Sequence, residues 1–256
     1  MHPDPHTSLC ADNTLKTLAY NPTMRRRGRV SVRKTDTMAI RGLLFDFDGL
    51  LLDTESGARL AFEELYRDHG HELPLDEWST LIGTIGASFD PVGHLEGLLG
   101  SPLDRAEISE RLREREHGLA DLEELRPGVE EYFAEAERLG LKTAVVSSSD
   151  TWWIERHLGR LGRLEGLDAI VAANGDTDRA KPRPDLYLEA LECLGLEPSE
   201  AIAFEDSPNG VRAAKAAGIA CVAVPGPMTA TLTLDEADLV LDSLADVPLA
   251  QLLERF

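Results

Sequence analysis

The segment from Leu43 to Glu55, LLFDFDGLLLDTE, contains four acidic residues within an otherwise apolar run. Asp46 and Asp48 are the unusual pair, because they interrupt a sequence that otherwise has the composition of a buried strand. Side chains two residues apart in a strand point to the same face, so the two carboxylates are expected to lie close together. Close carboxylates repel and raise each other's pKa unless a cation compensates them. The pair therefore indicates a site that needs positive charge.

Further polar residues follow other apolar segments: Ser147 after TAVV, Lys181 in the loop AKPRPD, and Glu205 and Asp206 after AIAF. Carboxylate oxygens without histidine suit Mg²⁺, whose coordination is completed by water and substrate phosphate. Lys181 can balance charge beside such carboxylates, and the Ser147 hydroxyl, with backbone N–H groups at a helix N-terminus, can hold phosphoryl oxygens. A turn, a helix cap or a surface charge is the alternative for each residue taken singly. Together they favour a Mg²⁺-assisted phosphate site.

The elements that must position these residues alternate along the chain. Strands are predicted in AIRGLLFDFDG, TAVV, LDAIVAA, EAIAFEDS, IACVAVPG and ADLVLDS, and helices between them from residue 125 onward. Strict alternation of this kind predicts an α/β fold, a parallel sheet with helices on both faces. Ligands of such sheets bind outside the carboxyl ends of the strands. The polar residues are therefore expected to converge on one edge of the sheet.

The segment 54–125 interrupts this alternation, because it contains only helical patterns. We predict an all-helical cap domain at 54–125, inserted into a catalytic core formed by 38–53 and 126–256. Residues 1–37 are polar and rich in Thr, Asn, Pro and Arg, which is typical of a disordered tail. The stretch MRRRGRVSVRK within it leaves a targeting segment or a nucleic-acid-binding arm as alternatives.

Four motifs, DFDGLLLDTE, VVSSSD, AKPRPD and AFEDSPNG, occur in this order within about residues 40–250. In order and spacing they resemble the haloacid dehalogenase (HAD) superfamily, and within it the β-phosphoglucomutase-like phosphatase group with a helical, C1-type cap. The resemblance implies a Rossmann-like, doubly wound parallel sheet. It also implies a Mg²⁺-dependent phosphatase that hydrolyses a small phosphorylated metabolite, such as a sugar phosphate, through an aspartyl-phosphate intermediate.

The resemblance also implies catalytic roles for four residues. Asp46 would be the nucleophile, and Asp48 would be the acid/base that protonates the leaving oxygen and later activates water. Ser147 would bind the phosphoryl group, and Lys181 would stabilise charge on the nucleophile and the phosphoryl oxygens. The metal ligands that it implies are a carboxylate oxygen of Asp46, the backbone carbonyl of Asp48, Glu205 and Asp206. This scheme needs opposite protonation states of the two aspartates when substrate arrives.

Candidate substrate contacts are less specific. They lie at the start of the cap, in a glycine-rich cap loop and beside the motifs: Thr54, Glu55, Gly83, Ser148 and Asn209. Ser149, like Ser148, is favoured as a helix-capping residue. For Trp152 and Trp153, packing in the core or between core and cap is favoured, and a position of one of them near the pocket is the alternative.

Three other functions compete with phosphate hydrolysis. A phosphomutase of the β-phosphoglucomutase type would be expected to carry histidine and arginine in the cap, where this chain has Ala58 and Gly86. A non-catalytic binding protein with the HAD fold would usually have lost Asp46, Asp48 or Lys181. The dehalogenases themselves do not need the second aspartate of the pair. These comparisons favour phosphate hydrolysis.

The composition limits the partners. The net charge of −20 argues against nucleic acid, which needs a basic surface. The chain has no run of 18 apolar residues, so no membrane span is predicted. The three cysteines, Cys10, Cys193 and Cys221, have no metal-binding spacing and are expected to be reduced thiols. We therefore expect a cytoplasmic enzyme, a monomer or small homo-oligomer, whose partner is a small phosphorylated metabolite.

Overall fold

The computed structural model of the 256-residue chain describes residues 9–10, 40–78, 81 and 89–256. Within the predicted tail, the described residues are Leu9–Cys10, which form strand β1, a strand that the sequence did not predict. The rest of the predicted tail lies outside the described residues. The predicted domain boundaries stay predictions.

One sheet organises the described part of the chain. Its order is β1-β4-β3-β2-β5-β6-β7, and all neighbours are parallel except β1 and β4. The parallel strands are β2 (Gly42–Phe45), β3 (Lys142–Ser147), β4 (Ala169–Ala172), β5 (Ala201–Glu205), β6 (Ala220–Ala223) and β7 (Leu239–Val240). The predicted Rossmann-like α/β fold is confirmed.

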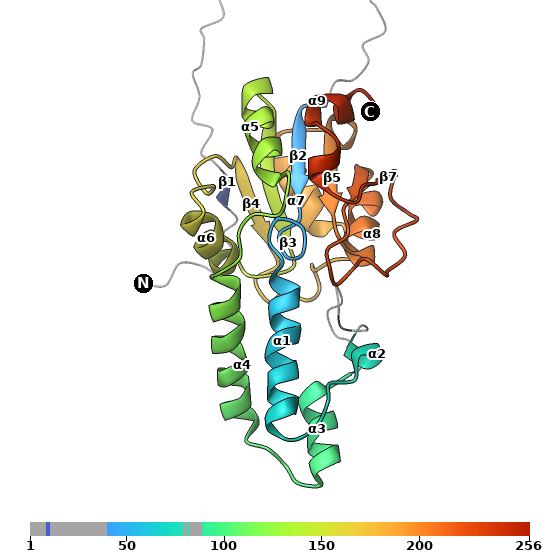
Figure 1. The fold of residues 1–256 in the computed structure, drawn as a ribbon. Helices are drawn as coiled ribbons and strands as arrows, with labels where there is room; N and C mark the ends of the chain where they lie inside the picture. The colour runs from blue at the N-terminus through green and yellow to red at the C-terminus, as the bar shows by residue number, and fades with distance from the viewer. Residues whose placement is uncertain (1–8, 11–39, 79–80, 82–88) are drawn as a thin grey trace, which may run out of the picture.

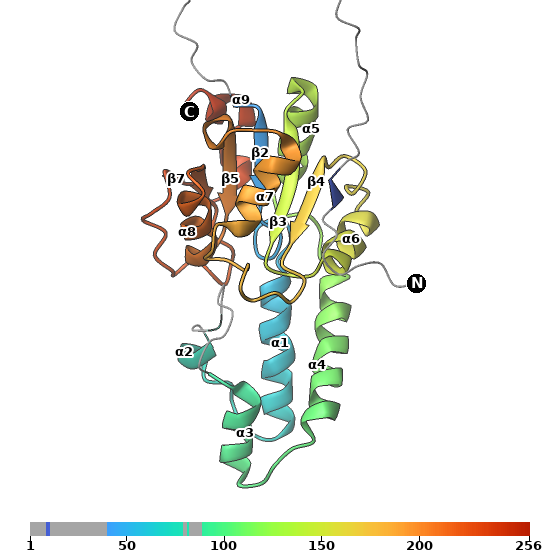
Figure 2. The same cartoon turned by 180° about the vertical axis from the view of Figure 1, so that it is seen from behind.

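Helices cover both faces of this sheet (Figure 1). One face carries α5 (Val129–Leu139), α6 (Thr151–Arg160) and α9 (Leu249–Leu253), with the 3₁₀ helix η2 (Leu244–Asp246). The other carries α7 (Asp185–Leu194) and α8 (Pro208–Ala216), which face the viewer in Figure 2, and the 3₁₀ helix η1 (Pro198–Glu200) precedes β5. Because both faces are covered, the strands are apolar on both sides.

The core beneath α5 is built on aromatic packing across the central strands. Phe45 of β2 stacks on Phe204 of β5 at a ring-centroid distance of 4.9 Å, and Tyr132 of α5 meets Phe204 edge-on at 5.6 Å. All three side chains are fully buried. Burial of such rings contributes several kcal/mol in total. This packing fixes the strand ends that carry the polar motifs.

Four helices extend beyond the carboxyl ends of the strands (Figures 1 and 2). This helical insert comprises α1 (Thr54–Asp68), α2 (Leu75–Trp78), α3 (Pro91–Leu99) and α4 (Arg105–Ala120). Aspartate side chains cap the N-termini of three of these helices, namely Asp53, Asp90 and Asp104. A separate apolar cluster that includes Leu65, Tyr66 and Leu95 holds the insert together. It lies where the sequence predicted a cap.

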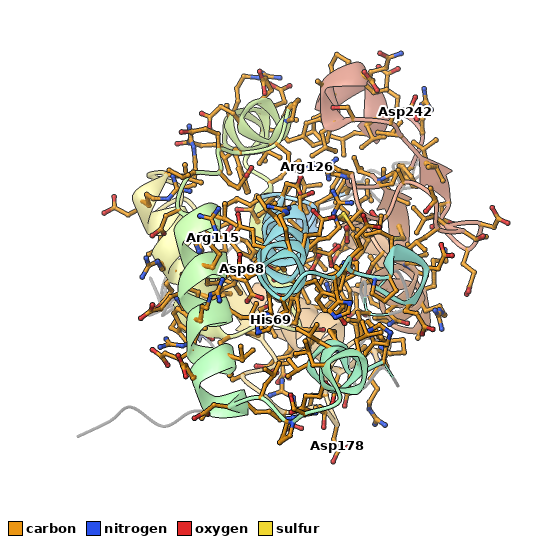
Figure 3. All side chains as sticks on the ribbon, turned by 60° about the horizontal axis from the view of Figure 1, so that its bottom comes forward. Asp68, His69, Arg115, Arg126, Asp178 and Asp242 are labelled. Atoms are coloured by element: carbon orange, nitrogen blue, oxygen red, sulfur yellow. The ribbon has the colours of Figure 1, made fainter. Side chains whose placement is uncertain are left out.

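Ion pairs join α1 and α4 along their outer faces. Arg115 contacts Glu64 through two hydrogen bonds of 2.7 Å, and Arg111 contacts Asp68. Figure 3 shows Arg115 and Asp68 on the two neighbouring helices, viewed from the end of the insert. These pairs are exposed, so solvent screens them and they set the alignment of the helices more than their stability.

Two sequence expectations concern the thiols and membranes. Cys221 is a free, buried thiol, but Cys193 is disulfide-bonded, so the prediction of a reduced thiol is wrong at Cys193. The side chain of Cys10 lies outside the described residues. Within the part of the chain that is described, no helix combines the length and apolar character that crossing a bilayer requires.

Two glycines at the ends of α5 provide a test of the packing. Gly128 and Gly140 both have positive φ, 88° and 69°. A Cβ on Gly128 would overlap the backbone of Leu244 and Ala245, whereas a Cβ on Gly140 would meet nothing within 4 Å. We expect Gly128→Ala to lower the free energy of unfolding by about 3 kcal/mol, from strain and overlap together. Gly140→Ala should cost only about 1 kcal/mol.

Urea denaturation at equal m-value measures both changes. Equal losses in the two variants would show that contact between α5 and η2 does not constrain Gly128.

Candidate active site

The polar motifs meet at the carboxyl edge of the sheet. Asp46 follows β2, Ser147 ends β3, and Glu205 ends β5 with Asp206 directly behind it. All four side chains are buried, as is Lys181. Pairing of β2 with β5 sets Phe45 opposite Phe204, so the residues that follow them emerge side by side. The predicted convergence on one edge is thus observed.

Lys181 joins two of the carboxylates. Its Nζ lies 2.5 Å from Asp46 Oδ1 and 2.7 Å from Glu205 Oε1. Tyr187, from α7, also donates its hydroxyl proton to Glu205 Oε1. Lys181 is the only buried lysine or arginine among the residues that the structure describes. One ammonium therefore faces a cluster with more negative charge than it can neutralise.

Three carboxylates can hold a divalent metal here. Asp46, Glu205 and Asp206 each place one oxygen within 4.8 Å of the others. Glu205 Oε2 is buried and has no hydrogen-bond partner within the described part of the chain. A Cβ on Gly210 would overlap the Glu205 carboxylate, and one on Gly49 would overlap that of Asp206. The glycines leave room for the carboxylates, and the unpartnered oxygen suits a cation.

The electrostatics of the site follow from burial. Burial raises the pKa of Asp46 to about 8, although the Lys181 ammonium acts in the opposite direction. Burial and the neighbouring Asp46 carboxylate hold the pKa of Asp206 well above its usual value. Burial would lower the pKa of Lys181, but the charges of Asp46 and Glu205 more than offset it and raise that pKa. Without a further cation, this site takes up protons.

Asp48 points to a different set of partners. Its Oδ1 accepts hydrogen bonds from Thr54 Oγ1 at 2.8 Å and Trp153 Nε1 at 2.9 Å. Its Oδ2 accepts from Ser149 Oγ at 2.5 Å and Ser147 Oγ at 3.3 Å. These four donors hold the Asp48 carboxylate apart from the Lys181 cluster. The two aspartates of the first motif therefore have separate environments.

Two cavities meet at Asp48. The inner cavity, of about 230 Å³, is lined by Asp46, Lys181, Asp206 and Asn209, and the outer cavity, of about 500 Å³, extends under the helical insert. Both cavities are lined by Asp48, Glu55, Ser148 and Ser149, and Thr54 lines the outer one. Four of the five predicted substrate contacts thus line a cavity. The fifth, Gly83, lies outside the described residues.

A tight turn after β2 shapes the inner cavity. Gly49 has φ of 81°, which favours glycine, and its N–H donates to Leu52 O at 2.7 Å. Arg126, labelled in Figure 3, donates to Gly49 O and, at 2.9 Å, to Pro225 O. Arg126 thereby ties the turn after β2 to the loop after β6.

Sequence reasoning missed several contacts of the site. Packing was favoured for Trp153 over a position near the pocket, and helix capping was favoured for Ser149, yet both donate to Asp48. Thr229 donates to Asp206 Oδ2 at 3.2 Å, and Tyr187 reaches Glu205 from α7. Ser149 belongs to the VVSSSD motif and Trp153 follows it closely, which is a usable signal. Thr229 and Tyr187 carry no signal in the sequence.

The haloacid dehalogenase-like hydrolase family matches residues 40–218, and the chain belongs to this family. It is 44% identical over 216 residues to the "Putative phosphatase YhcW" of Bacillus subtilis (strain 168), which covers 84% of this chain and 97% of the relative. These matches and the fold define a phosphatase, a phosphoric monoester hydrolase that acts on a phosphorylated metabolite.

Solved structures identify the group within the family to which the chain is similar. A "putative beta-phosphoglucomutase" from Thermotoga maritima superposes with a TM-score of 0.67 at 25% identity, covering 81% of this chain and 96% of that one. A mutant of CbbY from Rhodobacter sphaeroides, in complex with xylulose-(1,5)bisphosphate, superposes with a TM-score of 0.67 at 34% identity, covering 83% and 99%. The chain is thus a HAD phosphatase of the β-phosphoglucomutase-like group.

The raised pKa of Asp46 predicts a pH-dependent stability of the metal-free protein. The native state binds a proton that the unfolded chain, with an ordinary pKa of 3.8, does not. This contribution is complete below about pH 4 and is lost as the pH rises through about 8. In EDTA, Asp46→Asn should therefore become more stable than the wild type as the pH rises, by on the order of a few kcal/mol.

The measurement is urea denaturation of both chains across this pH range. The difference between them isolates residue 46 from the other acidic groups. A difference that stays constant from pH 4 to about 8 would contradict the assignment of a raised pKa.

Proposed function

We propose that this protein is a Mg²⁺-dependent phosphatase that hydrolyses a small phosphorylated metabolite through an aspartyl-phosphate on Asp46. The observation that carries the proposal is the cluster of three buried carboxylates, only two of which are paired with the one lysine ammonium. Such a cluster is costly for stability, and it is useful where a cation and an anionic phosphate are to be held together. Oxygen ligands without histidine favour Mg²⁺.

Asp46 is the group that attacks. Its carboxylate oxygen forms a bond to phosphorus while the bond from phosphorus to the leaving oxygen breaks, which divides hydrolysis into two steps. Lys181, 2.5 Å from Asp46 Oδ1, holds the carboxylate in place and offsets charge on the phosphoryl oxygens. Ser147 and the backbone N–H groups after it are placed to hold those oxygens.

Asp46, Glu205 and Asp206, with the backbone carbonyl of Asp48, would hold the Mg²⁺. When bound, this cation screens the nucleophile from the phosphate and stabilises the charge of the transferred group. Thr229 orients Asp206 through its hydrogen bond to Oδ2. Lys181 and Tyr187 both contact Oε1 of Glu205, which leaves Oε2 to bind the metal ion.

Asp48 is the proton carrier. In the first step it gives a proton to the leaving oxygen, and in the second it takes one from the water that attacks the aspartyl-phosphate. Its separate set of donors, Thr54, Ser147, Ser149 and Trp153, keeps it from pairing with Lys181. A group that must alternate between protonated and ionised forms is better placed apart from a permanent ammonium.

The substrate contacts are drawn from the two cavities. Thr54, Glu55, Ser148 and Asn209 line them beside Asp46 and Asp48, and Gly83 remains a candidate from the cap loop. The sugar bisphosphate bound by the CbbY mutant supports a phosphorylated sugar-like molecule as the general class. The inner cavity is large enough for one phosphate, and the outer one for a small leaving group.

Replacement of the nucleophile tests this proposal. Asp46→Asn should abolish turnover of para-nitrophenyl phosphate, by about 10³-fold or more, because the amide does not attack phosphorus. The wild type should need Mg²⁺ and lose activity in EDTA. The matched control is Asp178→Asn, on an exposed loop outside both cavities, which should retain full activity. A comparable rate in Asp46→Asn would disprove the nucleophile assignment.

Phosphomutase activity is the alternative that the family resemblance leaves open. Ala58 lines the outer cavity, where the mutases carry a basic residue, and Gly86 lies outside the described residues. We expect the wild type to hydrolyse β-glucose 1-phosphate more than it isomerises it when a glucose bisphosphate activator is present. Product analysis by ³¹P NMR distinguishes the two, and efficient isomerisation would overturn the hydrolase assignment. A non-catalytic binding protein would bind Mg²⁺ and turn over no ester.

A further inference from the structure

The outer cavity, where a leaving group would lie, has a negatively charged wall. Its described lining contains the acids Glu55, Glu116 and Asp150, in addition to Asp48, and no lysine or arginine. Lys181 lines the inner cavity only. The two cavities therefore differ, because the described lining of the inner one includes an ammonium beside its carboxylates, whereas that of the outer one includes carboxylates and no lysine or arginine.

Nearby arginines do not change this charge. Arg156 is bound to both carboxylate oxygens of Asp121, and Arg113 is bound to Glu110, so each is paired outside the cavity. Burial and the proximity of Arg113 hold the pKa of His117 below its ordinary value. His117 is thus neutral near pH 7 and adds no positive charge to the cavity wall.

Glu116 is the acid in the outer cavity whose charge is not balanced by a described partner. It lies on α4, is half-buried, and forms no hydrogen bond or ion pair with other described residues. Burial raises its pKa, a cost that a cation in the cavity would remove. A carboxylate in such a position is a ready partner for a positive ligand group.

Aromatic rings complete the wall. Trp152 and Trp153 lie with ring centroids 5.8 Å apart, and His117 lies 5.4 Å and 5.2 Å from them. Trp152 donates its indole N–H to Asp150 at 3.1 Å, which fixes the ring at the cavity mouth. Indole faces beside carboxylates attract organic cations, because the ring quadrupole and the acid act in the same direction.

We propose that the outer cavity selects phosphate monoesters whose leaving group carries a cationic amine, and rejects those that carry a second phosphate. The inference rests on the proposed phosphatase function, because it assigns the transferred phosphate to the inner cavity. A second phosphate would face Glu116 and Asp150 in a described wall that has no lysine or arginine, whereas an ammonium would meet these two carboxylates and the indole rings. The bisphosphate bound by the CbbY mutant is therefore not the expected substrate class here.

The test uses three esters of one chain length: aminohexyl phosphate, hydroxyhexyl phosphate and hexanediol bisphosphate. They share a primary alkoxide leaving oxygen and differ only at the distal end, so the chemical step is the same. With Mg²⁺ near neutral pH, kcat/KM should fall in that order, by about tenfold at each change of distal charge.

Glu116→Gln should reduce the preference for the amine over the hydroxyl ester by about tenfold. Because the readout is a ratio within one enzyme, any general loss of activity cancels. The matched control is Glu114→Gln, the same change at an exposed position of α4 that lines neither cavity, and it should keep the wild-type ratio. Glu116→Lys should instead raise kcat/KM for the bisphosphate.

Binding of the three esters to the Asp46→Asn chain, measured by calorimetry with Mg²⁺, separates the two proposals. Binding in the expected order without turnover by the wild type would support the cavity assignment and overturn the phosphatase mechanism. Turnover with no preference for the amine, or with the bisphosphate preferred, would overturn the cavity assignment alone. So would an unchanged ratio in Glu116→Gln.

Discussion

The ion pairs of Lys181 with Asp46 and Glu205 are the interaction on which this site depends. A buried carboxylate pays a desolvation penalty of several kcal/mol that a single ammonium cannot cancel for three of them. The penalty falls at the ends of two central strands, β2 and β5, whose side chains belong to the apolar clusters on both faces of the sheet. In the proposed mechanism, this uncompensated charge would give the site affinity for a divalent cation and, through that cation, for phosphate.

The register between β2 and β5 brings the two carboxylates that Lys181 contacts next to each other. Parallel pairing of β2 and β5 aligns Phe45 with Phe204, so Asp46 and Glu205 leave the sheet side by side and on the same level. A slip of one residue would turn one of these carboxylates to the opposite face and leave Lys181 with a single partner. The stacked rings of Phe45 and Phe204 thus protect the catalytic geometry as well as the core.

The sequence predicted the parts of the structure that depend on local pattern. Alternation of apolar runs and helices was enough to predict the parallel sheet, and motif order was enough to bring Asp46, Lys181 and Glu205 to one edge. Contacts between distant segments could not be predicted from local pattern. Trp153 reaches Asp48 from α6, the helix that follows β3, and β3 pairs with β2. Tyr187 reaches Glu205 from α7 on the opposite face of the sheet. Strand β1 has two residues, too few for any periodicity.

An acidic protein that acts on an anionic ester must attract that ester through charges close to its binding site. A net charge of −20 repels phosphate at a distance, but salt screens charges beyond about 8–10 Å under physiological conditions. Capture is therefore governed by the groups within that radius, where Lys181 and a bound metal ion would attract the phosphate, and Glu116 with Asp150 would attract a cationic group. A molecule with opposite charges at its two ends matches this field in one orientation only, with its phosphate toward Asp46. Charge separation across the two cavities would thus orient the ester for attack, in addition to selecting it.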